Sequence, residues 1–168
     1  YGDNYGYRSG LNKSMVSHLQ NKVNNILGVV DLNPGDLVID IGSNDGTTLS
    51  AFSSNLQLVG VDPTGEKFKE YYPEHIELIS DFFSDKLIRA SYPNKNAKVI
   101  TSFSMFYDLE SPQEFVDQIS NILDPKKGVW VFEQSYMPLM LERKSYDTIC
   151  HEHLEYYSLQ QIIWLLDR

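Results

Sequence analysis

The chain has 168 residues, with 14 Lys and Arg against 23 Asp and Glu, which gives a formal charge of −9. This surplus of carboxylates argues against a nucleic-acid partner, because binding a phosphate backbone needs a basic stripe. One cysteine, Cys150, excludes an internal disulfide framework and a zinc site built from several thiolates. No apolar run of about 18 residues and no signal-peptide pattern is present, so we expect a cytoplasmic protein without a membrane span.

Two features of the sequence suggest a single, incomplete domain. The chain starts at Tyr1 without Met, and it ends inside an apolar-periodic stretch, Ile162–Leu166, that carries no stop signal. A length of 168 residues suits one domain, since most domains have about 100–150 residues. We therefore expect a lid loop over residues 1–13 and one incomplete domain over residues 14–168.

The predicted elements alternate between helix and strand along the chain. Residues 1–13 are rich in Tyr, Gly, Asn and Ser and are expected to form a loop. Apolar residues at helical spacing predict a helix over 14–30, with Ser14 as its N-cap. Short apolar runs predict strands over 37–41, 58–61, 76–79, 97–102 and 129–133. Further helices are expected over 47–55, 66–72, 84–90 and 111–123, and from Ser158, where Gln161 completes a capping box.

This alternation predicts a doubly wound α/β fold of the Rossmann type, with a mostly parallel sheet, helices on both faces, and truncation at the C-terminal end. Ligands of such sheets bind outside the carboxyl ends of the strands, where the strand order reverses. Functional side chains should therefore follow the strands, at residues 42–46, Asp62, 81–83, 102–108 and 133–136.

The loop after the first predicted strand indicates a cofactor that contains a nucleoside. Residues 40–46 read Asp-Ile-Gly-Ser-Asn-Asp-Gly, and glycines at such a place let a ligand approach the backbone closely. Asp62 lies about 20 residues further on, where a carboxylate can accept hydrogen bonds from ribose hydroxyls.

The chemistry of this loop favours S-adenosylmethionine over a dinucleotide. A loop that binds pyrophosphate needs Gly-x-Gly-x-x-Gly and a helix start without negative charge. Here Ser43 and Asn44 stand where the second glycine would fall, and Asp45 would repel a phosphate. S-adenosylmethionine carries a sulfonium, an ammonium and no phosphate. NAD, and a glycine turn with a solvated Asp, remain alternatives.

Two further segments are candidates for the site, each with a structural alternative. Asp81–Phe83 follows the third strand, so it could bind adenine through one carboxylate and two rings, or cap a helix and fill the core. The loop Tyr5–Gly10 offers phenol groups that could donate to a substrate oxygen or an enolate. Its alternative is a loop packed by its own aromatic rings.

A polar cluster near the end of the chain leaves three interpretations open. His151 and His153 flank Glu152 just before the last predicted helix. Metal binding would need a third ligand from elsewhere, and the His-Glu-x-x-His spacing is absent. A network of His and Tyr hydrogen bonds is the structural alternative. An acid/base group is the third, because the pKa of imidazole near neutrality suits removal of a proton from carbon beside a carbonyl.

Five segments, taken in chain order, together match one known family. They are Tyr5-Gly6-Tyr7-Arg8-Ser9, Ile39-Asp40-Ile41-Gly42-Ser43-Asn44-Asp45-Gly46, Asp81-Phe82-Phe83, Phe132-Glu133-Gln134-Ser135-Tyr136 and Tyr146-Asp147-Thr148-Ile149-Cys150-His151-Glu152-His153. In these segments the chain resembles the sugar C-methyltransferases that act on nucleotide-linked 4-keto deoxysugars. The early Tyr loop and the final Glu-His pair are the more specific of the matches.

The resemblance implies S-adenosylmethionine as methyl donor for the domain over 14–168, and a nucleotide sugar as substrate. From the residue spacing above we expect no metal site. A base removes the proton beside the ketone, and the enolate attacks the donor's methyl group. By the same match, Glu152 and His153 are the catalytic pair with His153 as the base, and Tyr7 lies near the reacting sugar. The implied cofactor contacts are Gly42, Ser43, Asn44, Asp45, Gly46, Asp62, Pro63, Asp81, Phe82, Phe83 and Ser104.

The chain departs from this family in two respects. Asp108 occupies the place of a His that some members carry after the fourth strand. Family members are also longer, with a cysteine-rich zinc module before this region and a further domain after it. We therefore expect a fragment that binds the cofactor and can be inactive alone. Alternatives are methyl transfer to oxygen or nitrogen of a small metabolite, or a non-catalytic nucleoside-binding domain; the sequence leaves the oligomeric state open.

Overall fold

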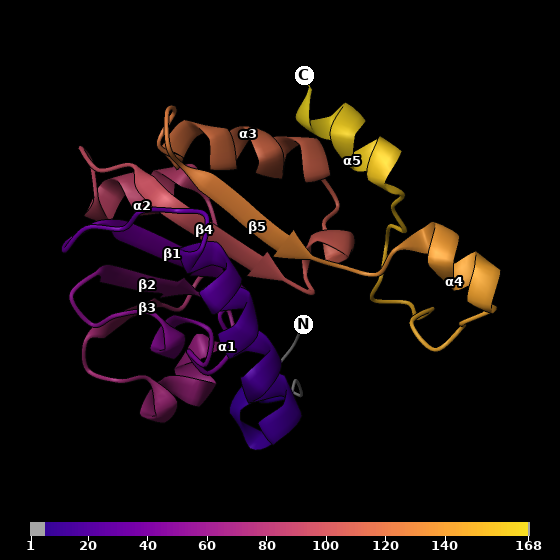
Figure 1. Cartoon of the computed structure of the whole chain (residues 1–168), viewed down its shortest axis with the longest axis horizontal. Coiled ribbons are helices and arrows are strands. Elements are labelled where there is room, and N and C mark those ends of the chain that lie inside the picture. Colours follow the sequence, from indigo (N-terminus) through magenta and orange to yellow (C-terminus); the bar gives the residue numbers. More distant parts are fainter. Residues whose placement is uncertain (1–5, 168) are drawn as a thin grey trace.

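The computed structural model describes residues 6–167 of the chain. Five parallel strands form one sheet, in the order β3-β2-β1-β4-β5 (Figure 1). The strands are β1 (Leu37–Ile41), β2 (Gln57–Val61), β3 (Ile76–Ile79), β4 (Ala97–Phe103) and β5 (Val129–Glu133). The chain winds outward from β1 in both directions, so the strand order reverses between β1 and β4. The predicted doubly wound α/β fold is confirmed.

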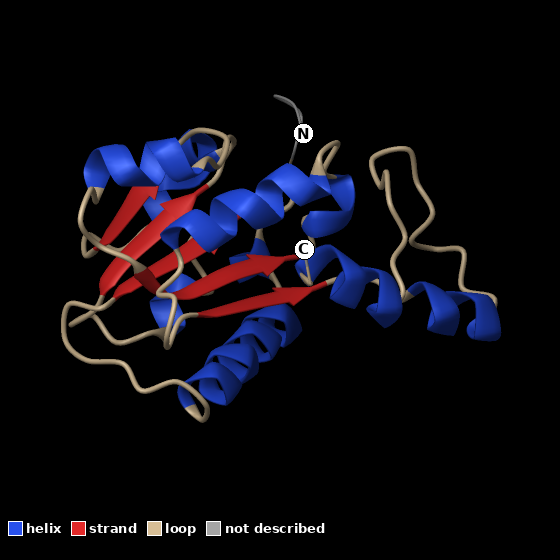
Figure 2. Cartoon of the chain, turned by 90° about the horizontal axis from the view of Figure 1, so that it is seen from above, coloured by secondary structure: helices blue, strands red, loops and turns tan. Residues whose placement is uncertain are grey.

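Helices cover both faces of the sheet, as Figure 2 shows. The α-helices are α1 (Lys13–Leu27), α2 (Asp85–Ser91), α3 (Pro112–Ile122), α4 (Met137–Arg143) and α5 (Leu159–Leu166). Short 3₁₀ helices are η1 (Ser9–Leu11), η2 (Leu49–Ala51), η3 (Gly65–Tyr71) and η4 (Phe106–Asp108). Residues of α1 and η2 pack on the face of Val38, whereas α2, α3 and α5 pack on the face of Ile39. All five residues of β1 are buried, because apolar layers lie on both of its sides.

An aromatic cluster fixes η4, the turn that follows β4. Phe106 is 1% exposed. Its ring centroid lies 5.5–5.9 Å from those of four others, contributed by α3, β5 and the segment before α5: Phe115, Trp130, Phe132 and Tyr157. Rings at such distances and tilts attract one another beyond the area they bury. The cluster therefore holds the carboxyl end of β4 against the far edge of the sheet.

The predictions for the helices were less accurate than those for the strands. The helix expected over 47–55 is wrong, and only η2 forms there. The Thr47 backbone N–H and hydroxyl both donate to the Asp45 carboxylate, and the Ser50 hydroxyl donates to the Gly46 carbonyl. Such side-chain bonds compete with helical ones. The segment over 66–72 is the 3₁₀ helix η3, and α1 is capped by Asn12 rather than Ser14.

The segment between β5 and α5 departs from the compact body. Helix α4, which the sequence did not predict, has no buried residue, and it projects from the sheet together with the loop that follows it (Figures 1 and 2). We call this projecting segment, residues 137–156, the arm. A parallel bridge between Tyr136 and Tyr157 closes its base. Directly after Tyr157, the predicted capping box of Ser158 and Gln161 opens α5. Within residues 6–167, no helix combines the length and apolar character that crossing a bilayer requires.

Candidate functional site

The glycine-rich loop after β1 adopts a conformation that most residue types avoid. Gly42, Asn44 and Gly46 have φ angles of 73°, 51° and 76°. Glycine populates this region without strain, and Asn tolerates it better than most residues. Gly60 of β2 lies so close to the loop that an added Cβ would sit 2.6 Å from Ser43 Oγ. The loop is therefore packed tightly against β2, with its backbone turned toward the open end of the sheet.

Asp62 joins the end of β2 to this loop. Its Oδ2 accepts a hydrogen bond from the Asn44 backbone N–H at 2.8 Å. Its Oδ1 accepts from the Thr64 N–H and hydroxyl, both at 2.7 Å. Asp62 is 6% exposed and lies on the wall of a cavity. Because a carboxylate oxygen can accept more than one hydrogen bond, Asp62 can also bind hydroxyl groups of a ligand.

Asp40, at the end of β1, is a buried acid that the sequence reading did not assign to the site. It is 3% exposed, and its Oδ1 accepts a hydrogen bond from Thr101 Oγ1 at 2.5 Å. Burial raises the pKa of Asp40 to about 7, against the lowering effect of hydrogen bonds from Thr101 and Thr48. The negative charge of Asp62 adds to the increase. A positively charged ligand group beside Asp40 would favour its ionised form.

The segment before α1 folds back over the glycine loop. Asn44 accepts a hydrogen bond from the Ser9 N–H at 2.9 Å and donates one to the Tyr7 carbonyl at 3.0 Å. The Asp45 carboxylate accepts from the Gly10 N–H at 2.8 Å. These contacts place Tyr7 at the cavity. Residues 1–5 of the predicted lid, including Tyr5, lie outside the described part of the chain.

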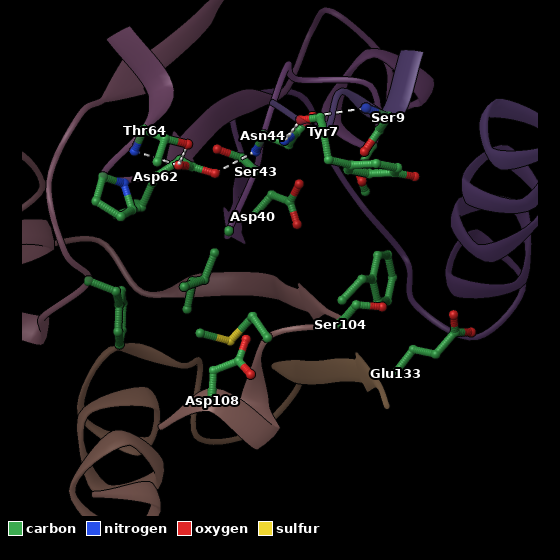
Figure 3. Close-up of a pocket in the computed structure, with 18 of the residues that line it drawn as sticks. Tyr7, Ser9, Asp40, Ser43, Asn44, Asp62, Thr64, Ser104, Asp108 and Glu133 are labelled. Carbon is green, nitrogen blue, oxygen red and sulfur yellow. Dashed lines mark hydrogen bonds between the residues drawn. The ribbon is translucent and has the colours of Figure 1, made fainter. Parts of the chain in front are cut away.

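A cavity of about 620 Å³ opens at the carboxyl ends of the strands (Figure 3). That is the edge that the sheet topology predicts for a ligand. The sequence-predicted residues that line it are Tyr7, Gly42, Ser43, Asn44, Asp62, Pro63, Phe82, Phe83 and Ser104. It therefore brings together residues from the ends of four strands and from the segment before α1.

Three of the predicted cofactor residues do not line this cavity. Asp45 faces the opposite side, toward Gly10 and Thr47, and Gly46 follows it. Asp81 is exposed, and its Oδ1 accepts from the backbone N–H of Phe82 at 2.7 Å. Asp45 holds the N-terminal segment in place, and cofactor contacts by these three residues stay predictions.

The predicted catalytic pair, Glu152 and His153, lies on the arm and also outside the cavity lining. Glu152 is exposed, whereas the His153 ring is 4.2 Å from the Tyr107 ring, centroid to centroid. His153 Nδ1 is 2.7 Å from the Thr148 carbonyl oxygen, so that nitrogen donates and Nε2 is left to accept a proton. Tyr107 follows Ser104, which lines the cavity, by three residues. His153 is thus separated from the cavity wall by one aromatic ring.

Among residues 6–167, no group of three or more His, Cys, Asp and Glu side chains is arranged to hold an ion.

Two lining residues, His18 of α1 and Glu133 at the end of β5, form a contact that the sequence alone could not reveal. His18 Nε2 lies 2.8 Å from Glu133 Oε1, although the residues are 115 positions apart. Glu133 belongs to one of the predicted strand ends, but no local motif marks His18. Only the folded sheet brings α1 against the carboxyl end of β5.

The charges of the cavity decide which cofactor fits. Its described lining includes no Lys or Arg, and it contains the carboxylates of Asp40, Asp62, Asp108, Glu110 and Glu133. A pyrophosphate would be repelled here, because it needs cations or free helix N-termini. A nucleoside with cationic groups and no phosphate fits, with Asp62 for the hydroxyls and Asp40 for a cation.

Comparison with known proteins agrees with this geometry. Residues 14–168 match the family model described as a methyltransferase domain. The chain belongs to this methyltransferase family. Among curated proteins it is 27% identical over 165 residues to the C-methyltransferase NovU of Streptomyces niveus. That alignment covers 97% of this chain but only 39% of NovU, so the chain spans about two fifths of that relative's length.

Solved methyltransferase structures share the fold. A chain in the complex of the Haloferax volcanii Trm112 activator with a methyltransferase superposes with a TM-score of 0.68 at 17% identity, over 94% of this chain and 71% of that one. The plantazolicin methyltransferase BpumL, solved with a desmethylPZN analogue and SAH, has a TM-score of 0.63 at 17% identity, over 90% of this chain and 61% of BpumL. At 17% identity, the similarity to these structures shows the fold alone.

Proposed function

We propose that the chain is the cofactor-binding part of an S-adenosylmethionine-dependent methyltransferase that methylates carbon of a nucleotide-linked keto-deoxysugar. The observation that carries the proposal is an acidic, phosphate-repelling cavity beside a glycine loop, in a chain of the methyltransferase family. BpumL, whose fold is similar, is crystallised with SAH, the demethylated product of this donor.

S-adenosylmethionine supplies an electrophilic methyl group bound to a positively charged sulfur. Asp62 accepts hydrogen bonds from the ribose hydroxyls, and the backbone of Gly42 lets the donor lie close to β1. Phe82 and Phe83, also on the cavity wall, contact the adenine ring. Asp40 faces the cationic part of the donor, and its ionisation accompanies binding.

Methylation of carbon is supported by the similarity to the C-methyltransferase NovU, and a keto sugar by the resemblance of the Tyr7 and Glu152–His153 segments. Carbon becomes nucleophilic only when a proton is removed beside a carbonyl, so the reaction needs a base. By the resemblance His153 removes this proton, with Glu152 beside it and Tyr7 donating to the substrate oxygen.

Deuterium exchange tests carbon methylation directly. The chain is incubated in D₂O with SAH and a panel of 4-keto deoxysugars linked to thymidine, uridine or guanosine diphosphate. We expect NMR to show catalysed loss of the proton beside the ketone for at least one sugar, because only carbon methylation requires that step. His153→Ala should lower the exchange rate by about 100-fold or more, since general bases contribute about 10²–10⁴-fold.

The control for this experiment is His75→Ala, because His75 is exposed and lies before β3, at the opposite edge of the sheet. It should exchange like the unmodified chain. Methyl transfer to oxygen or nitrogen, found by mass spectrometry in a reaction with S-adenosylmethionine and without exchange, would contradict the proposed carbon chemistry. Exchange by His153→Ala at the rate of the unmodified chain would remove His153 from the base position.

A further inference from the structure

Glu133 occupies the end of the cavity opposite the glycine loop. It terminates β5, its side chain is 34% exposed, and it lines the cavity. Figure 3 shows Glu133 on the same side as Ser104, with Asp62 and Thr64 on the other side. If the donor's nucleoside lies along Asp62, Glu133 is left facing the space for the methyl acceptor.

Two side chains of α1 hold the Glu133 carboxylate. His18 Nε2 lies 2.8 Å from Oε1, and Lys22, one helical turn further along α1, bonds to Oε2. Burial by itself would raise the pKa of Glu133, but hydrogen bonds from Lys22 and His18 outweigh burial and lower it below its usual value. The carboxylate is therefore ionised near neutral pH and acts only as a hydrogen-bond acceptor.

The carboxylate has acceptor capacity beyond these two partners. A carboxylate offers about four lone-pair positions, and His18 and Lys22 use one on each oxygen. A ligand group that meets Glu133 must bring an O–H or N–H. Ketone oxygens and diphosphates offer only lone pairs, so they cannot form hydrogen bonds with the Glu133 carboxylate.

Ser104, next to Glu133, has a backbone conformation found at functional sites. Its φ is 55°, in the left-handed region that non-glycine residues rarely adopt. The Ser104 N–H donates to the Glu133 carbonyl at 2.8 Å. The strained turn thus locks the ends of β4 and β5 together beside the carboxylate.

We propose that Glu133 binds a ring hydroxyl of the methyl acceptor, and that His18 and Lys22 are positioning residues that hold its carboxylate for this contact. This inference rests on the proposed function, since it names the part of the sugar that the same cavity recognises. The hydroxyl-bearing edge of the sugar then faces the end of β5. Glu133 is then a determinant of specificity between hydroxylated and deoxygenated sugars.

Calorimetry on the SAH-bound chain tests the contact. The probes are pairs of nucleotide-linked 4-keto sugars that differ by one ring hydroxyl. The unmodified chain should bind the hydroxylated member of one pair more tightly. Glu133→Gln should weaken that binding by roughly tenfold, because hydrogen bonds to charged groups are stronger than neutral ones. The affinities for the deoxygenated member and for SAH should stay within about twofold of those of the unmodified chain, because the variant loses only the contact with the hydroxyl.

Variants of Lys22 test whether this residue positions the Glu133 carboxylate or only stabilises the fold. Lys22→Arg keeps the ion pair and should keep the preference for the hydroxylated sugar, whereas Lys22→Met should lose part of it with SAH binding intact. Glu74→Gln, an exposed carboxylate before β3, is the matched control for the loss of one charge. It should match the unmodified chain with every probe.

Each outcome has a separate meaning. Unchanged sugar preference in Glu133→Gln, with SAH still bound, would overturn this inference and leave the proposed function standing. If the unmodified chain binds SAH but no sugar of the panel, the proposed acceptor class fails and the inference fails with it. Loss of SAH binding in Glu133→Gln would show that Glu133 supports the fold or the donor rather than the acceptor.

Discussion

Asp40 ties the stability of the chain to pH. Its pKa is raised from 3.8 to about 7 by burial. The folded state therefore holds a proton that the unfolded state releases, so this contribution to stability is complete below about pH 4 and is lost as the pH rises to about 7. The shift corresponds to about 4 kcal/mol at most.

Asp40→Asn tests this linkage, because an amide of the same size cannot titrate. Urea unfolding of the unmodified chain should give a free energy that falls between pH 5 and pH 7.5, relative to the variant, by about 2–3 kcal/mol. Equal pH dependence in the two proteins would show that Asp40 does not carry the proton.

The sequence predicted some of the cavity residues and missed others. Gly42 and Asp62 were predicted at the cavity because both belong to a local pattern, a glycine turn after a strand and an acid after the next strand. His18 was not, since its contact with Glu133 depends on how α1 crosses the sheet. His153 was selected by resemblance, and its distance from the cavity depends on the position of the arm.

At the scale of the element, the glycine loop is the part of the site that tolerates the fewest residue types. Gly42→Ala forces a side chain into a positive φ and brings its Cβ to 3.4 Å from Met105, which lines the cavity. We expect about 1 kcal/mol of lost stability from the backbone and, in addition, a loss of SAH affinity of tenfold or more, as the loop shifts.

Gly35 provides the matched control for that variant. Its φ is 82°, but nothing lies within 4 Å of an added Cβ, and it precedes β1 at the opposite end of the strand. Gly35→Ala should lose similar stability in urea unfolding while keeping SAH affinity. Equal SAH affinity in Gly42→Ala and Gly35→Ala would mean that the loop does not contact the cofactor.

The strands were predictable and several helices were not, for a physical reason. A buried parallel strand such as β1 must be apolar on both faces, which leaves a short continuous signal in the sequence. A helix was expected over 47–55, but the Asp45 carboxylate accepts from the Thr47 backbone N–H and hydroxyl, and the Ser50 hydroxyl donates to the Gly46 carbonyl. The helix therefore stops at one turn. The spacing of apolar residues along the sequence does not reveal tertiary and side-chain contacts of this kind.

At the scale of the whole molecule, topology explains why the site lies where it does. The strand order reverses beside β1, and the carboxyl ends of β1, β2, β4 and β5 all contribute to one cavity. This could be predicted from the alternation of strand and helix. The projection of α4 could not, because none of its residues is buried and two of its apolar residues, Leu139 and Leu141, are exposed.

Calorimetric titration of the chain with SAH, and separately with NAD⁺, tests the central claim. We expect one SAH per chain and no binding of NAD⁺, because the carboxylates around the glycine loop repel pyrophosphate. At a concentration 100 times its Kd, SAH should stabilise the fold by about 2.7 kcal/mol and raise Tm by about 5–10 °C. No heat with SAH, or binding of NAD⁺ in its place, would contradict the account.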